Sequence, residues 1–425
     1  MSHFHLRGAV THCEDVALPE IAKAVGTPVF VYSANAMRGQ ARALRAALSS
    51  LEDPLIAYAV KANPNIAVLT ALAAEGLGAD VVSGGEYRRA VAAEVAPCRI
   101  VFSGVGKTAE EMRLALAGGL CQFNLESLPE AEMLSQVALS MGLTAPVAFR
   151  VNPDVDAGSH AKISTGAAHN KFGIPIEETP AACTALRGLP GLEFKGVAVH
   201  IGSQLISLAP LETAIARLGA MIAELRSRGH VIATADLGGG LGIQYDPALP
   251  PPPSVEDYGA MVARLTRGWD VRLIFEPGRL LVGSAGVLMT EVVRIKPGLK
   301  NPFVIVDAAM NDLVRPSLYD AWHAIGAVSP KSGQMIADVV GPVCESGDVF
   351  AVARRLDRVE AGDLMVIHTA GAYAATMAGT YNSRALTPEV LVDGRDWAVV
   401  RPRRGSEAFL ADEKVPSWLE VAGRR

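Results

Sequence analysis

The chain has 425 residues, of which 50% are hydrophobic and 20% are charged, and its formal net charge is -5. A chain of this length and composition can bury a large core and is expected to divide into two or three domains. Positive charge is concentrated only at Arg401–Arg404 and at the terminal Arg424–Arg425, which gives no electrostatic footprint for nucleic acid. Small polar molecules are therefore the expected partners.

The cysteines and the N-terminus exclude other classes. The five cysteines are odd in number and contain no C-x-x-C pair, so neither a disulfide framework nor a metal site is expected; they are Cys13, Cys98, Cys121, Cys183 and Cys344. The N-terminus lacks a basic segment followed by an apolar one, and no apolar stretch is long enough to span a bilayer. We expect a cytoplasmic protein with no membrane contact.

Short β-type runs alternate with helical segments through the first two thirds of the chain. The expected strands are Leu55–Val60, Ala79–Val82, Arg99–Ser103, Cys121–Leu125, Pro146–Asn152, Gly196–His200, Ala233–Leu237 and Val271–Glu276. Segments such as Glu110–Ala117 and Leu211–Arg226 have helical spacing between them. This alternation predicts an α/β fold, a (β/α)8 TIM-type barrel over residues 31–277, with a doubly wound open sheet as the competing architecture.

Beyond Glu276 the sequence changes to β-rich runs separated by Gly and Pro. These runs are Gly286–Ile295, Phe303–Asp307, Met335–Val343, Asp363–Thr369, Val390–Val392 and Trp397–Val400. They predict a separate β-rich barrel or sandwich domain over residues 278–425. The early run Pro28–Tyr32 precedes the first barrel strand, so the N-terminal segment, residues 1–30, is expected to join that β domain.

Lys61 is the most informative single residue. It follows the apolar run Leu55–Val60 and precedes Ala62-Asn63-Pro64-Asn65, so a buried strand delivers one amine to a turn. Desolvation there would lower the pKa of the amine and favour the neutral form that attacks carbonyl groups. The alternative is a strand-end lysine that reaches out to water.

Three further motifs follow predicted barrel strands. Gly238-Gly239-Gly240 lets backbone N–H groups approach an anion, or else forms only a tight turn. Glu276-Pro277-Gly278-Arg279 places a carboxylate and a guanidinium across a turn, to serve opposite ends of one ligand or to pair with each other. His200 and Ser203 suit stacking on a flat ring and binding a phosphate, although a strand-end His is often structural.

The order of these motifs resembles that of a known family. Tyr58-Ala-Val-Lys61-Ala-Asn63, His200-Ile-Gly-Ser203, the glycine run, Glu276-Pro-Gly-Arg279, Cys344-Glu345 and Gly371-Ala-Tyr373 together resemble the alanine-racemase-like, fold-type III pyridoxal-phosphate decarboxylases, and within them the diaminopimelate decarboxylases. The resemblance covers nearly the whole chain. It departs at Tyr87 and at Ala385-Leu386-Thr387, neither of which carries chemistry.

The resemblance implies a role for each motif. The cofactor would be pyridoxal 5'-phosphate, bonded to Lys61, with Glu276 on its pyridine nitrogen and His200 against its ring. The other residues that bind its phosphate or contact it elsewhere would be Ser203, Gly238, Gly239, Gly240, Pro277, Gly278, Arg279 and Tyr373. Cys344 would donate a proton in catalysis, and the substrate would contact Arg279, Arg315, Tyr319, Glu345 and Tyr373.

The expected reaction is decarboxylation of meso-diaminopimelate to L-lysine and CO2, the last step of lysine biosynthesis. The distal carboxylate of that substrate needs a guanidinium, which Arg315 offers, and its ammonium needs an acid, which Glu345 offers. The family implies a homodimer with shared active sites, the Cys344–Glu345 loop of one protomer reaching Lys61 of the other. Two alternatives remain: decarboxylation of ornithine, arginine or carboxynorspermidine, or a non-catalytic homologue.

Overall fold

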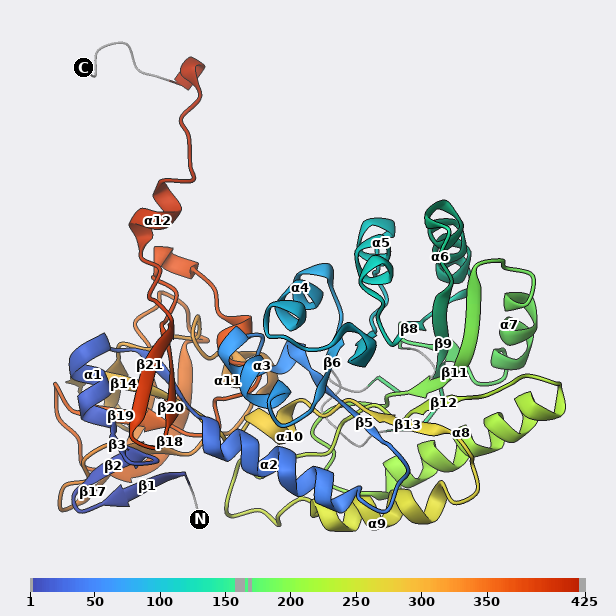
Figure 1. The fold of residues 1–425 in the computed structure, drawn as a ribbon. Coiled ribbons are helices and arrows are strands. Elements are labelled where there is room, and N and C mark those ends of the chain that lie inside the picture. The colour runs from blue at the N-terminus through green and yellow to red at the C-terminus, as the bar shows by residue number, and fades with distance from the viewer. Residues whose placement is uncertain (1–2, 157–164, 167–169, 420–425) are drawn as a thin grey trace.

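The computed structural model describes residues 3–156, 165–166 and 170–419. Figure 1 shows a barrel with its surrounding helices on one side and a β-rich part, which contains elements from both ends of the chain, on the other.

Eight parallel strands close into a barrel. Their order around it is β9-β11-β12-β13-β5-β6-β7-β8, and β8 pairs back to β9, with the short β10 (Ile174–Pro175) attached to β9. The strands are β5 (Leu55–Ala59), β6 (Gly78–Val81), β7 (Ile100–Phe102), β8 (Gln122–Leu125), β9 (Ala145–Asn152), β11 (Leu192–Val199), β12 (Thr234–Asp236) and β13 (Arg272–Phe275). Closure confirms the predicted TIM-type barrel and excludes the open sheet.

Helices cover the outside of the barrel, the first of them before β5 and the others after successive barrel strands (Figure 1). They are α2 (Ala34–Ala47), α3 (Ile66–Ala73), α4 (Gly84–Ala92), α5 (Ala109–Gly118), α6 (Leu128–Met141), α7 (Thr179–Leu186), α8 (Ala209–Ser227) and α9 (Val255–Leu265). Polar caps fix where several begin: Asn65 accepts from the Ala67 amide, and Thr108 forms a capping box with Glu111. Each cap sets the length of the loop that follows a barrel strand, where side chains meet at the carboxyl face.

The β-rich part is built on β14 (Gly286–Lys296). Its main sheet runs β18-β17-β15-β14-β4-β20-β21, and β19 also pairs with β14 and β16. The strands are β4 (Val29–Ser33), β15 (Phe303–Val306), β16 (Ile325–Ala327), β17 (Gln334–Val340), β18 (Val349–Asp357), β19 (Leu364–Ile367), β20 (Glu389–Asp393) and β21 (Asp396–Arg401). Because β4 lies between β14 and β20, the N-terminal segment contributes a strand to this sheet, as predicted.

Several short elements lie outside the predicted pattern. A small sheet of β1 (Phe4–Arg7), β2 (Val10–Cys13) and β3 (Val16–Ala17) precedes α1 (Leu18–Val25). The sequence pattern predicted neither this sheet nor the strands β16 and β18. Short helices α10 (Arg279–Val282) and α11 (Arg315–Tyr319) follow β13 and β15. The domain limits at residues 30 and 277 stay predictions.

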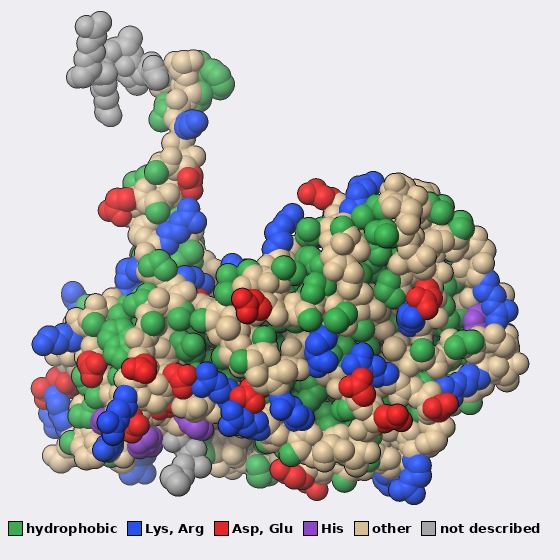
Figure 2. All heavy atoms as spheres, viewed as in Figure 1, with side chains coloured by type: hydrophobic (Ala, Val, Ile, Leu, Met, Phe, Trp, Pro, Cys, Tyr) green, Lys and Arg blue, Asp and Glu red, His purple; other side chains and the backbone are tan. Residues whose placement is uncertain are grey.

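The C-terminal segment carries α12 (Ser406–Leu410) and stands clear of the body in both views (Figures 1 and 2). On the face shown in Figure 2, basic and acidic side chains are interspersed rather than gathered by sign. No helix among the described residues is long and apolar enough to cross a membrane.

Candidate active site

One cavity brings together most of the residues expected to hold a cofactor. It opens among the loops after β5, β11, β12 and β13, at the carboxyl face of the barrel, where TIM-type enzymes carry their active sites. Its lining includes Lys61, His200, Ser203, Gly238, Gly239, Gly240, Glu276, Pro277, Gly278, Arg279 and Tyr373. The structure therefore places this predicted set around one space, and the role of each residue stays a prediction.

Lys61 lies in a short helical turn after β5 and forms an ion pair. Its Nζ donates to Asp80 Oδ2 at 2.8 Å, and Asp80 on β6 is fully buried. Burial lowers the pKa of Lys61, but the charges of Asp80 and Glu276 outweigh it and raise the pKa above its ordinary value. The predicted lowering of this pKa is therefore wrong for the chain without a cofactor, because the sequence did not reveal the neighbouring carboxylates.

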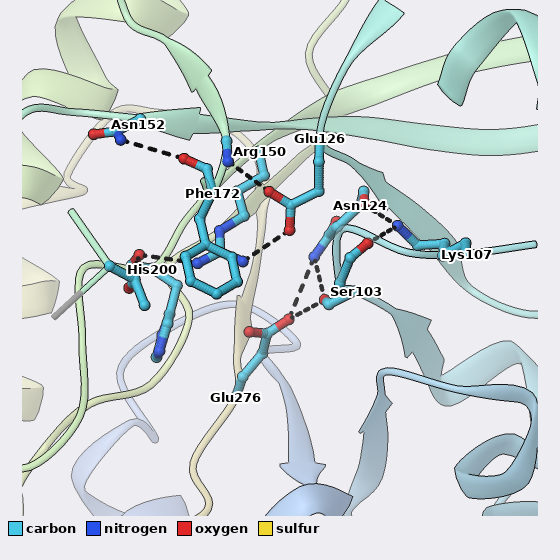
Figure 3. Close-up of polar contacts among 12 residues, drawn as sticks. Ser103, Lys107, Asn124, Glu126, Arg150, Asn152, Phe172, His200 and Glu276 are labelled. Carbon is cyan, nitrogen blue, oxygen red and sulfur yellow. Dashed lines mark hydrogen bonds and ion pairs between the residues drawn. The ribbon is translucent and has the colours of Figure 1, made fainter. Parts of the chain in front are cut away.

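Glu276 forms the floor of the cavity. Its Oε1 accepts from Ser103 Oγ at 3.1 Å and from Asn124 Nδ2 at 3.3 Å, as Figure 3 shows. Burial and the charge of Asp236 hold the pKa of Glu276 well above its ordinary value. The carboxyl group is thus fixed at one oxygen, while Figure 3 shows the other oxygen turned away from Ser103 and Asn124.

His200 stands at the end of β11 as a neutral imidazole. Its Nδ1 accepts a hydrogen bond from the Gly239 amide at 3.1 Å, which leaves the proton on Nε2. Burial, with the charges of Arg150 and Lys61, lowers the pKa of His200 well below its ordinary value. A neutral ring held this way presents a flat face to the cavity.

The glycine run is required by close backbone contacts. A Cβ on Gly238 would lie 2.5 Å from the Val199 carbonyl oxygen, and one on Gly239 would lie 2.1 Å from that of Glu276. The Gly238 and Gly239 amides donate to Asp236 Oδ1 and His200 Nδ1, so they are already used within the protein. The glycine run therefore packs closely against the ends of β11, β12 and β13. Because the Gly238 and Gly239 amides already donate within the protein, they cannot also make the predicted contact with an anion in this arrangement.

Arg279 lies beside Ser203 and Tyr373 at the side of the cavity. Its Nη2 donates to Ser203 Oγ at 3.1 Å and its Nη1 to the Tyr245 hydroxyl at 2.5 Å, with the guanidinium 4.8 Å from the centre of the Tyr373 ring. The Arg279 Nε atom is buried without a hydrogen-bond partner in the described structure. An unpaired buried donor next to a hydroxyl fits an anionic group such as a phosphate.

Tyr373 is held in an unusual backbone conformation next to the lysine turn. Its φ is 54°, in the left-handed region that side chains rarely adopt, and its amide donates to the Ala62 carbonyl at 2.8 Å. Asn63 Nδ2 also donates to the Gly371 carbonyl at 3.2 Å. The 371–373 loop of the β-rich part is thereby tied to the segment that carries Lys61.

Arg315 belongs to a second polar group beside the cavity. Its guanidinium lies 4.3 Å from the centre of the Tyr245 ring, and its Nη1 donates to His323 Nε2 at 2.9 Å. His323 Nδ1 is 2.8 Å from the His368 carbonyl, which fixes the ring with Nε2 as acceptor. Tyr245 therefore lies between Arg315 and Arg279, and it links the predicted substrate residue to the predicted phosphate site.

Cys344 and Glu345 are not brought into this cavity by their own chain. Both are exposed, and neither lines the space around Lys61. The Cys344 amide donates to Asn382 Oδ1 at 3.1 Å, and the Tyr381 hydroxyl donates to Glu345 Oε2 at 3.5 Å. Tyr319, at the end of α11, is close enough to Arg315 to influence its pKa.

Sequence reasoning missed several residues that shape the site. Asp80, Asn124 and Asp236 are fully or almost fully buried polar residues within barrel strands. Polar side chains inside otherwise apolar strands were an available signal for them. Tyr245 and His323 lie in loops, and no pattern in the sequence marks them.

A second space of about 360 Å3 adjoins this cavity and shares Lys61, His200 and Glu276 with it; Ser103, Asn124 and Arg150 also line it. Arg150 donates to Glu126 Oε1 at 2.9 Å and to the His200 carbonyl at 3.3 Å, and it stacks on Phe172 (Figure 3). Lys107 donates to the Asn124 carbonyl at 2.7 Å. These bonds fix the loops from which the cavity is built.

Comparison with known proteins identifies the family. The family model described as "Pyridoxal-dependent decarboxylase, pyridoxal binding domain" matches residues 38–283. Diaminopimelate decarboxylase from Zymomonas mobilis is 54% identical over 99% of this chain and 100% of its own length, and that from Pseudomonas fluorescens is 46% identical over 98% and 100%. The chain belongs to the diaminopimelate decarboxylase family of pyridoxal-dependent enzymes.

Solved structures agree with this family. The diaminopimelate decarboxylase from M. jannaschii in complex with L-lysine is 34% identical, with a TM-score of 0.94, over 98% of this chain and 99% of that one. A lysine/ornithine decarboxylase from Vibrio vulnificus, complexed with putrescine, is only 22% identical at a TM-score of 0.77 and shows the fold alone. In this family the cofactor is pyridoxal 5'-phosphate, and the cavity described above offers it an amine, a carboxylate and an anion site.

Proposed function

We propose that this chain decarboxylates meso-2,6-diaminopimelate to L-lysine and CO2, the last step of lysine biosynthesis, with pyridoxal 5'-phosphate in the cavity around Lys61. The observation that carries the proposal is the convergence of Lys61, Glu276, His200, Ser203 and Arg279 on one space in a chain 54% identical over nearly its whole length to a diaminopimelate decarboxylase.

Each residue has a task that its surroundings support. Lys61 supplies the amine, and Asp80 holds it as an ammonium until it is used. Glu276 would hold the pyridine nitrogen through the oxygen that Figure 3 shows turned away from Ser103. When bound, pyridoxal 5'-phosphate accepts the electron pair that remains after CO2 departs. The neutral ring of His200 would pack against the ring of the cofactor.

The phosphate end is assigned to Ser203, Arg279 and the glycines Gly240 and Gly278. The support is the buried Nε of Arg279, which has no partner within the described structure and lies next to the Ser203 hydroxyl. A Cβ on Gly278 would lie 3.1 Å from Ala59 Cβ and 3.4 Å from the Tyr373 hydroxyl, so a side chain at this position would crowd the turn that leads to Arg279.

The substrate end is assigned to Arg315, Tyr319, Glu345 and Tyr373, with Arg279. Arg315 is 6% exposed, and no carboxylate is among the partners described for it, so its charge can hold the distal carboxylate of diaminopimelate. Ornithine and carboxynorspermidine decarboxylases would need no such guanidinium. This difference in charge favours diaminopimelate over the polyamine precursors.

Cys344 and Glu345 are assigned to the site of a second copy of the chain. Both are exposed and outside the cavity of their own chain, while the reaction needs a proton donor at the carbon that loses CO2. Decarboxylation replaces the carboxylate on that carbon by a proton, and a thiol can deliver it. We therefore propose a homodimer in which each Cys344–Glu345 loop completes the other protomer's site.

Product analysis tests the proposed reaction. The protein with pyridoxal 5'-phosphate is incubated in parallel with meso-diaminopimelate, ornithine and arginine, and the amines and CO2 are measured. Lysine should form from diaminopimelate alone. Putrescine from ornithine as the main product would assign the chain to the polyamine reaction, and no product from any substrate would favour a non-catalytic homologue.

A further inference from the structure

Arg315 is held beside the cavity by uncharged groups. Its Nη1 donates to His323 Nε2 at 2.9 Å, and its guanidinium lies 4.3 Å from the centre of the Tyr245 ring. Arg315 is 6% exposed, and no carboxylate among the described residues forms an ion pair with it. Arginines are almost never buried unless they are paired with an acid, so this arrangement needs an explanation.

The imidazole of His323 can only accept from Arg315, because both of its ring nitrogens have fixed roles. Nδ1 lies 2.8 Å from the His368 carbonyl oxygen, which can only accept, so Nδ1 carries the proton. A guanidinium can only donate, so Nε2 presents its lone pair to Arg315. Burial and the charges of Arg315, Arg279 and Arg354 lower the pKa of the ring to about 3. His323 is therefore a neutral acceptor.

Tyr245 lies between two guanidinium groups without neutralising either. Its ring centre is 4.3 Å from Arg315 and 5.7 Å from Arg279, and its hydroxyl accepts from Arg279 Nη1 at 2.5 Å. The ring also packs edge to face on His323, with the ring centres 5.3 Å apart. Burial and the charge of Arg279 lower the pKa of Arg315. Two buried cations thus lie side by side, and an anionic ligand would supply the charge that they lack.

The uncharged partner of Arg315 has a consequence for binding. A carboxylate in the place of His323 would orient the guanidinium equally well, but it would also neutralise it. A carboxylate on a ligand would then have to displace that acid or bind to a pair with no net charge. The imidazole fixes the direction of one N–H group and leaves the charge and the remaining N–H donors of the guanidinium available.

We propose that His323 is a positioning residue that makes the subsite around Arg315 selective for carboxylates, because it fixes the guanidinium through a neutral nitrogen and leaves its full charge to the distal carboxylate of an amino-acid ligand. His323 lines neither of the two spaces around Lys61, so it acts through Arg315. That the ligand is diaminopimelate or its product rests on the proposed function. The neutral state of the His323 ring does not.

L-Lysine and cadaverine test this role, because they differ only in the carboxylate that L-lysine retains. The dissociation constants of both are measured with the protein loaded with pyridoxal 5'-phosphate. His323→Gln keeps an uncharged acceptor, whereas His323→Glu places a carboxylate beside Arg315. The preference for L-lysine over cadaverine should change by less than about threefold in His323→Gln and fall by about tenfold or more in His323→Glu, through weaker binding of L-lysine.

His230→Glu is the matched control. His230 is also a buried histidine that packs on an aromatic ring, that of Phe194 at 5.8 Å, and the charges of Arg187 and Arg228 act on it. It lines neither space around Lys61, so His230→Glu should leave both dissociation constants unchanged. Equal losses for both ligands in His323→Glu would show that His323 only supports the fold. An unchanged preference there would show that the charge at this position does not matter, and either result would overturn the proposal.

Nitrogen-15 NMR of histidine-labelled protein tests the neutral ring even if His323→Glu does not fold. The signals of His323, assigned by their loss in His323→Gln, should show one proton, on Nδ1, at about pH 7 both before and after L-lysine is added. A proton on Nε2 would overturn the proposal. Because these measurements record binding and protonation rather than turnover, their failure is distinguishable from a failure of the proposed decarboxylation.

Discussion

Replacing Arg315 with alanine should separate substrate recognition from the rest of the site. The side chain is 6% exposed, stacks on Tyr245 at 4.3 Å and donates to His323 at 2.9 Å. Removing a guanidinium from a desolvated carboxylate costs about 2–5 kcal/mol. At about 1.4 kcal/mol per factor of ten, diaminopimelate should bind from about 30-fold to several thousand-fold more weakly.

The assay compares binding of diaminopimelate with binding of ornithine, which lacks the distal carboxylate and should bind almost unchanged. Arg354→Ala is the matched control, because Arg354 also stacks on an aromatic ring, that of Trp322 at 4.3 Å, and donates to the His323 carbonyl at 2.8 Å. Arg354 lines neither the cavity around Lys61 nor the 360 Å3 space next to it. Equal losses for both ligands in Arg315→Ala would show that Arg315 supports the fold instead.

Three further predictions test other parts of the account. Mixing Lys61→Ala with Glu345→Ala under subunit exchange should restore roughly a quarter of the activity, since half of the dimers gain one intact site; no recovery despite proven exchange would refute shared sites. Burial lowers the pKa of His323 to about 3 in the folded chain from 6.5. As the pH falls, His323 is therefore protonated in the unfolded chain before it is protonated in the folded chain. Between pH 6.5 and about pH 3, the free energy of unfolding should fall by up to about 1.4 kcal/mol for each pH unit. A His323→Gln variant in which the free energy of unfolding has the same pH dependence would contradict this. Gly239→Ala, whose Cβ would lie 2.1 Å from a carbonyl oxygen, should abolish cofactor binding, whereas Gly106→Ala, with open space around it, should not; normal binding in the first would show that the turn can relax.

The barrel could be predicted because its signal is local and repeated. Each strand is a short apolar run followed by a helical segment, as in Leu55–Ala59, all five residues of which are buried. Once the strands close into a barrel, their carboxyl ends meet at one face, so Lys61, His200 and Glu276 converge although they are far apart in sequence. The small β1–β3 sheet was missed because its short strands lack an apolar run: β1 reads Phe-His-Leu-Arg, and only Phe4 of it is buried.

The electrostatics of the site could not be predicted in the same way. The pKa of Lys61 is raised rather than lowered because Asp80, on the next strand, contacts it, and strand register is not visible in the sequence. Tyr245 and His323 reach Arg315 from loops whose paths depend on the whole fold. In the proposed homodimer, the position of Cys344 relative to Lys61 would depend on a second copy of the chain.

The central claim is that Lys61 is the amine that bonds to pyridoxal 5'-phosphate in this cavity. Loading the protein with the cofactor, reducing it with borohydride and mapping the modified peptide by mass spectrometry tests this directly. The reduced pyridoxyl group should be found on Lys61 alone, and Lys61→Ala should show neither the label nor the cofactor absorbance. A label on Lys107, which is buried among Gly104, Asn124 and Glu130, or on Lys171 would contradict the account.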